Sequence, residues 1–223
     1  MYSLTTIVSV SGVDQVEKLL VTRRKTINML VDKYPKDFQM CLGAAEIYYI
    51  EGTDVGPAKS WQQLCETLLH KKPWKRVAQV MLTQEMVEWH LQKLDQYKSD
   101  ITWAEQLEKG KVQLYPKSAL YNYAQTKEGR EVMAANTRRS AAADKKRLDR
   151  EKLLIWQKLD SYEKSDPYNA FYNYHRASLL MAYGKQREAI DEIRKGLRKD
   201  FLETYKKERV KAMARILEEI DFP

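Results

Sequence analysis

Apolar residues recur every three or four positions along most of this chain. Leu20, Ile27 and Val31 belong to one such series, and another runs through residues 148–162. This spacing places apolar side chains on one face of an α-helix, and each such helix must bury that face against a neighbour. Only residues 1–12 have the pattern of a strand or an extended arm. The pattern therefore predicts an all-α fold.

Prolines divide the helical pattern into segments. Pro35, Pro73, Pro116 and Pro167 each follow a helical run, at intervals of 38, 43 and 51 residues. A proline ends one helix and is accepted in the first turn of the next, so each interval can hold two helices and a turn. Helical hairpins repeated at this length are typical of a solenoid. We expect a right-handed α-solenoid with an N-terminal arm (1–12), about four hairpins (13–73, 74–116, 117–167 and 168–201) and a C-terminal capping helix (202–223).

Two stretches of the chain are nearly the same. Residues 115–123 read YPKSALYNY and residues 166–174 read DPYNAFYNY. We interpret both as the first helix of a hairpin, with tyrosines that mainly pack between helices. Residues two positions apart cannot share a helix face, so one member of each pair, Tyr121 and Tyr123 or Tyr172 and Tyr174, is the better candidate for an exposed groove.

The last hairpin resembles a tetratricopeptide repeat. Its sequence, NAFYNYHRASLLMAYGKQREAIDEIRKGLRKDF, has small or apolar residues at the positions that the family uses for close helix packing, and a glycine at the turn. The matching residues are Ala177, Gly184, Ala189, Ile193 and Gly196. Asn173 stands where the family has tryptophan.

A second, similar match runs from Glu85 to Pro116. It has Ala104 and Gly110 at small positions and Asp100 as an expected N-cap. The pentatricopeptide repeat, whose hairpins have nearly the same size, is a close competitor. Either resemblance implies stacked hairpins that present a binding surface.

The chain has a net charge of +8, and many of its basic residues lie in clusters. Between Asn136 and Lys152 there are seven basic and three acidic side chains, with three consecutive alanines that favour helix. We expect two extended helices in residues 117–167. The simpler interpretation of residues 136–152 is a basic helix face exposed to solvent. The more specific interpretation is a surface that binds an acidic partner. The candidate partner-binding residues are Arg138, Arg139, Lys145, Lys146, Arg147 and Arg150, together with Lys71, Lys72, Lys75 and Arg76.

Catalytic and cofactor motifs are missing from the sequence. His70, His90 and His175 occur singly, without zinc-ligand spacing, and there is no glycine-rich phosphate loop. We therefore expect no enzyme activity, no cofactor and no metal site. Cys41 and Cys65 are isolated, which predicts buried, reduced thiols in an intracellular protein of the cytoplasm or the mitochondrial matrix.

Two functional classes remain open. The first is a non-enzymatic scaffold, adaptor or accessory subunit that binds an acidic surface of a larger protein complex. The second is a pentatricopeptide-like protein that binds single-stranded RNA. Hairpins of unequal length would disturb the one-base-per-repeat spacing of such readers, so we favour the scaffold. The sequence predicts no membrane insertion, because no run approaches the ~18 apolar residues of a spanning helix.

Overall fold

The computed structural model describes residues 22, 25–34, 36–51, 61–70, 74–112 and 121–220. These residues form helices without a strand, which confirms the all-α prediction. Residues 25–33 are helical, and the predicted arm at 1–12 lies outside the described residues. The other helices are α2 (Phe38–Glu51), α3 (Trp61–Leu68), α4 (Lys75–Glu108), α5 (Tyr121–Ala124), α6 (Lys127–Ser165), α7 (Phe171–Ala182), α8 (Gln186–Gly196) and α9 (Lys206–Glu219).

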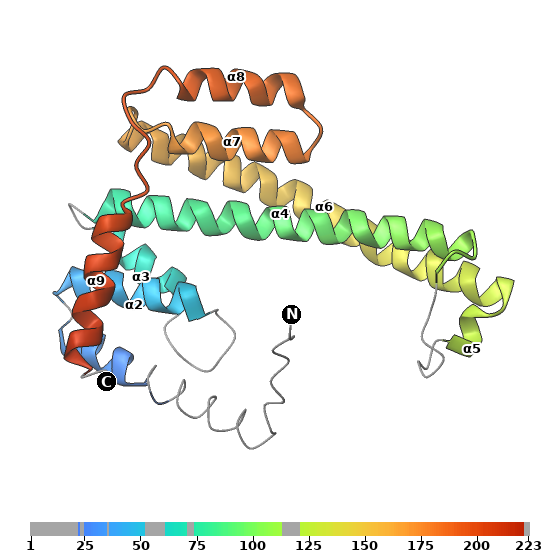
Figure 1. Ribbon diagram of the computed structural model, residues 1–223, viewed down its shortest axis with the longest axis horizontal. Helices are drawn as coiled ribbons and strands as arrows, with labels where there is room; N and C mark the ends of the chain where they lie inside the picture. The colour runs from blue at the N-terminus through green and yellow to red at the C-terminus, as the bar shows by residue number, and fades with distance from the viewer. Residues whose placement is uncertain are drawn as a thin grey trace, which may run out of the picture. The chain divides into compact units, whose positions relative to one another are not determined.

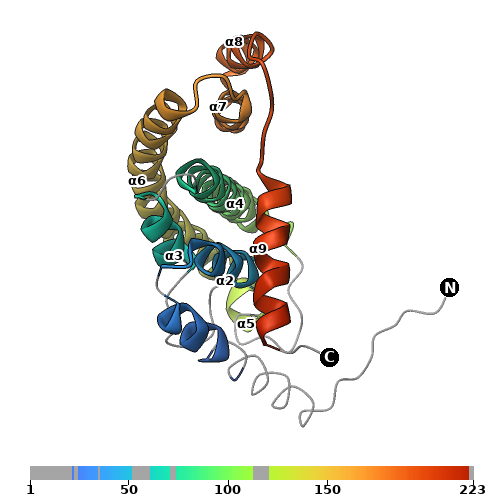
Figure 2. The ribbon, with the colours of Figure 1, turned by 90° about the vertical axis from the view of Figure 1, so that its left-hand side faces the viewer.

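The chain divides into two compact units. The first contains residues up to Leu82 and from Glu203 onward, and the second contains Thr83–Leu202. In the first unit, α9 packs along α2 although the two helices are far apart in sequence (Figure 2). A buried ion pair supports this contact, since Arg209 Nε lies 2.8 Å from Glu46 Oε2.

The second unit is built on an antiparallel pair of long helices. Glu108 of α4 pairs with Arg138 of α6, and further back on α4 the ring of Tyr97 meets Lys145, so the two helices run in opposite directions. At the end of the pair where α5 lies (Figure 1), apolar residues of α4, α5 and α6 form a shared core. This core contains Ala104, Leu107, Ala124, Met133 and Ala134.

Three predictions about residues 74–116 are wrong. Residues 75–108 form one helix and not a hairpin, and Asp100 lies inside it, where its Oδ1 accepts a hydrogen bond from Gln96, so it is not an N-cap. Gly110 is not a helix-packing residue. It has a φ of 65° directly after α4, and the amide of Lys111 donates to the carbonyl of Gln106, so Gly110 ends the helix.

The repeated tyrosine stretches also differ in structure. Tyr172 is buried in α7, whereas Tyr121 begins the one-turn helix α5. Thr126 separates α5 from α6, because its extended backbone and its side chain, which accepts from the Gly129 amide, cap the start of α6. The segment 127–165 is therefore one helix, and not part of two extended helices as predicted.

Helices α7 and α8 form the predicted last hairpin (Figure 1). Gly184 has the predicted left-handed conformation, with a φ of 74°, and the amide of Lys185 donates to the carbonyl of Leu180. Ala177, Leu180 and Ala189 form the core between the two helices. A Cβ atom on Gly196 would lie 3.3 Å from side-chain atoms of Asn173 and Tyr174, so a small residue is needed there.

Replacing Ala189 with Leu is expected to lower the free energy of unfolding by about 1–3 kcal/mol, because Ala189 is fully buried and a larger side chain overpacks the contact. Lys185→Leu is the matched control, since Lys185 is exposed at the same turn. Urea unfolding of both variants checks this prediction. Equal losses of stability would contradict it.

The C-terminal helix differs in register from the prediction that Val210, Met213 and Leu217 pack inward. Val210 is exposed, and the buried residues of α9 are Arg209, Ala212 and Ile216. The helix packs along α2, and its expected role as a cap on the hairpins stays a prediction. Gly43 allows this contact, because its α-carbon lies against the backbone of Ala212.

His175 of α7 makes stability depend on pH. Burial lowers its pKa to about 4, against the opposing effect of Glu88. Between this value and the ordinary pKa near 6.5 only the unfolded chain binds the proton, so stability falls as the pH falls. We expect the protein to be about 2 kcal/mol less stable at pH 5 than at pH 7.5 through this group. Urea unfolding of His175→Gln should show a smaller pH dependence, and an unchanged dependence would contradict the prediction.

Candidate functional site

The solvent face of α6 carries the candidate binding residues. The helix buries Ala141, Leu148, Ile155 and Tyr162, which are spaced by seven residues. At about 100° per residue, the positions on the opposite face follow one another at alternating steps of four and three. They are Arg139, Ala143, Lys146, Arg150, Leu153 and Gln157, all exposed, and we call them the α6 stripe.

The structure separates the predicted basic residues into two groups. Arg138 pairs with Glu108, Lys145 with Asp149 at 3.5 Å, and Arg147 with Asp144 at 2.8 Å. The hydrogen bond from Arg138 lowers the pKa of the Glu108 carboxyl. These three cations are therefore already neutralised by acidic neighbours.

The three cations of the α6 stripe are not neutralised in this way. Arg139, Lys146 and Arg150 have no ion pair with any residue that the structure describes. Arg150 Nε only approaches the carbonyl of Lys146, at 3.4 Å. Their charges are thus concentrated on one face and open to a partner.

An apolar pocket of about 340 Å³ lies beside the C-terminal part of the stripe. Leu153 belongs to both, and its side chain is 61% exposed. Lys152 lies over the ring of Tyr183, with Nζ 4.1 Å from the ring centre. The pocket is lined by Lys152, Leu153, Trp156, Leu179, Leu180, Tyr183, Lys185 and Glu188.

A buried polar cluster supports the Tyr183 side of this pocket. His90 Nε2 lies 2.9 Å from the Tyr183 hydroxyl, and His90 Nδ1 lies 3.8 Å from Glu151 Oε2. Burial lowers the pKa of His90, against the effect of Glu151, and burial raises the pKa of Tyr183 to about 12. Both groups are therefore neutral near pH 7 and act as a structural hydrogen-bond pair.

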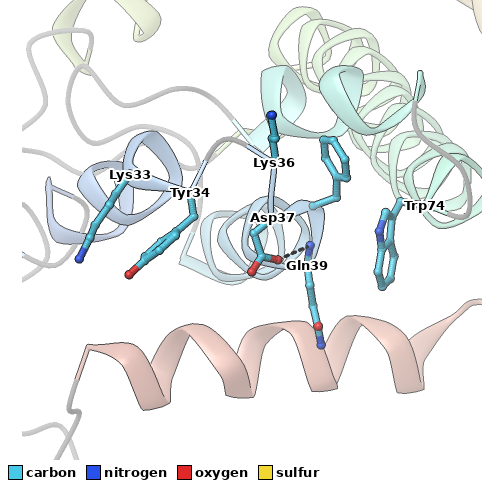
Figure 3. A pocket seen from close by; sticks show the side chains of 7 residues that line it. Lys33, Tyr34, Lys36, Asp37, Gln39 and Trp74 are labelled. Carbon is cyan, nitrogen blue, oxygen red and sulfur yellow. Dashed lines mark hydrogen bonds between the residues drawn. The ribbon is translucent and has the colours of Figure 1, made fainter.

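The other predicted basic cluster lies in the first unit. Lys75 and Arg76 are exposed at the start of α4, and Lys71 and Lys72 lie outside the described residues. Sequence reasoning missed an open pocket of about 650 Å³ nearby (Figure 3). Aromatic and basic residues close together in the sequence were the signal that could have indicated it. The pocket is lined by Lys33, Tyr34, Lys36, Asp37, Phe38, Gln39 and Trp74.

The acidic group of that pocket is already engaged. Asp37 Oδ1 accepts from the amides of Gln39 and Met40 at 3.2 Å and so caps α2. Its Oδ2 accepts from Arg215 at 2.6 Å. Lys33 and Lys36 therefore dominate the charge of the pocket.

No family model, curated protein or solved structure matches this chain. Within the described ranges, no helix has the length and apolarity needed to cross a bilayer. The same residues contain no group of three or more histidine, cysteine or acidic side chains that could hold a metal ion.

Proposed function

We propose that this chain is a non-enzymatic protein-interaction scaffold, an adaptor or accessory subunit of a larger assembly, in the cytoplasm or the mitochondrial matrix. The observation that carries the proposal is the α6 stripe, where Arg139, Lys146 and Arg150 form no ion pair with a described residue. Like charges at helical spacing repel one another, so an acidic partner surface gains electrostatic energy there.

The repeat architecture is part of this proposal. The α7–α8 hairpin, with its glycine turn and small core residues, supports a tetratricopeptide-like lineage. A right-handed stacking of the helices stays a prediction, whereas the expected hairpins at 74–116 and 117–167 each contain one long helix, α4 or α6, instead.

Reversing the three stripe charges tests the proposal. Arg139→Glu, Lys146→Glu and Arg150→Glu together are expected to reduce the recovery of co-purifying proteins from native lysate at least tenfold. The matched control reverses Lys206, Lys207 and Lys211, which are exposed on α9. Circular dichroism checks that both variants fold. Equal recovery with both variants would contradict the proposal.

Single-stranded RNA binding is the second candidate, and the pocket of Figure 3 favours it. Tyr34 and Trp74 beside Lys33 and Lys36 are the residue types that stack on bases and contact phosphates. If RNA is the ligand, the purified chain binds a mixed-sequence strand with sub-micromolar affinity, and log K falls by roughly 0.7 per neutralised phosphate as log salt rises. We expect weak binding instead.

A further inference from the structure

The α6 stripe changes character along its length. Its first part is cationic, through Arg139, Lys146 and Arg150, and its second part is apolar, through Leu153 beside the pocket. Leu154 is also exposed, at 59%. A partner must therefore match charge at one end and bury apolar side chains at the other.

We propose that the α6 stripe docks one acidic amphipathic helix of a partner protein, with an apolar side chain of that helix in the pocket beside Leu153. This inference rests on the proposed scaffold function. The stripe residues follow one another at steps of four and three, which is the spacing that a second helix lying along α6 can match. From Arg139 to Gln157 the stripe is about 27 Å long at 1.5 Å per residue, so a helix of about 18 residues covers it.

The apolar end favours aliphatic side chains over nucleotide bases. Bases stack on exposed aromatic faces, but the ring of Tyr183 is covered by Lys152. Trp156 packs against the core between α7 and α8 and is only partly exposed. The pocket of about 340 Å³ is near the lower limit for a ligand site, which suits one or two side chains.

Photo-crosslinking identifies the occupant directly. The full-length chain carries p-benzoylphenylalanine in place of Leu153 or, separately, Gln157, and the matched control carries it in place of Ile190 on the exposed face of α8. After irradiation in the source cells, the adducts are sequenced by mass spectrometry. We expect stripe adducts with net-negative segments that have apolar residues at i, i+3 or i+4, and i+7, and their loss when Arg139, Lys146 and Arg150 are changed to Glu.

The outcomes separate the two claims. A basic or non-helical protein segment, or no protein adduct at either stripe position, overturns the docked acidic helix but leaves the scaffold function standing. An RNA adduct overturns both. A synthetic peptide of the captured segment gives a second readout: Leu153→Lys should weaken its binding at least tenfold, and Leu197→Lys, at an exposed position away from the stripe, should leave it unchanged.

Discussion

Replacing Arg176 with Ala is expected to destabilise the α7–α8 hairpin by about 3–5 kcal/mol, because it breaks a buried ion-pair network. The Arg176 side chain is 5% exposed, and its Nε and Nη1 lie 3.0 Å from Glu192 and Asp160. It also pairs with Glu163. The network thus joins α6, α7 and α8.

The Glu163 and Glu192 carboxylates of this network are ionised near pH 7, because the pKa of each is lowered. Burial raises the pKa of Glu163, but hydrogen bonds from Lys199 and Arg176 outweigh it and lower the pKa overall. Without Arg176, buried negative charge loses its main compensation. Hydrogen exchange of the α7 and α8 amides measures the loss. Arg194→Ala, in an exposed pair with Asp191, should cost less than about 0.5 kcal/mol, and equal effects would contradict the account.

Replacing Gly43 with Leu is expected to cost about 3 kcal/mol or more, because α2 and α9 touch at this point. A Cβ atom on Gly43 would lie 2.2 Å from the carbonyl oxygen of Ala212, so any side chain forces the helices apart. Urea unfolding and hydrogen exchange of α9 measure the effect.

The matched control places the same side chain on the outside of the contact. Ala214 is exposed on α9, and Ala214→Leu should change stability by less than about 0.5 kcal/mol. If Gly43→Leu were as stable as this control, the close approach of α2 and α9 would be wrong.

Helix content and the last hairpin could be predicted from local signals. Apolar spacing indicates a helix, and Gly184 marks its turn. The break expected near Asp100 had no such signal, since residues 75–108 contain neither glycine nor proline. A repeat length alone therefore predicted a turn where the local sequence continues a helix.

Long-range contacts could not be predicted in this way. The packing of α2 on α9 pairs Glu46 with Arg209, but the residues next to either one in the sequence do not indicate that the two lie close together. The candidate site could not be predicted fully from sequence for the same reason. Arg138 and Arg139 are adjacent in sequence, but only Arg138 reaches Glu108, thirty residues earlier, so sequence could not tell the paired cation from the open one.

The scaffold function is tested most directly by the stoichiometry of the complex that co-purifies with the tagged full-length chain after nuclease treatment. Quantitative mass spectrometry should find the same partner proteins in a fixed ratio to the chain, with recovery unaffected by the nuclease. Recovery that is lost with the nuclease, or the lack of any protein in a fixed ratio, would contradict the proposed function.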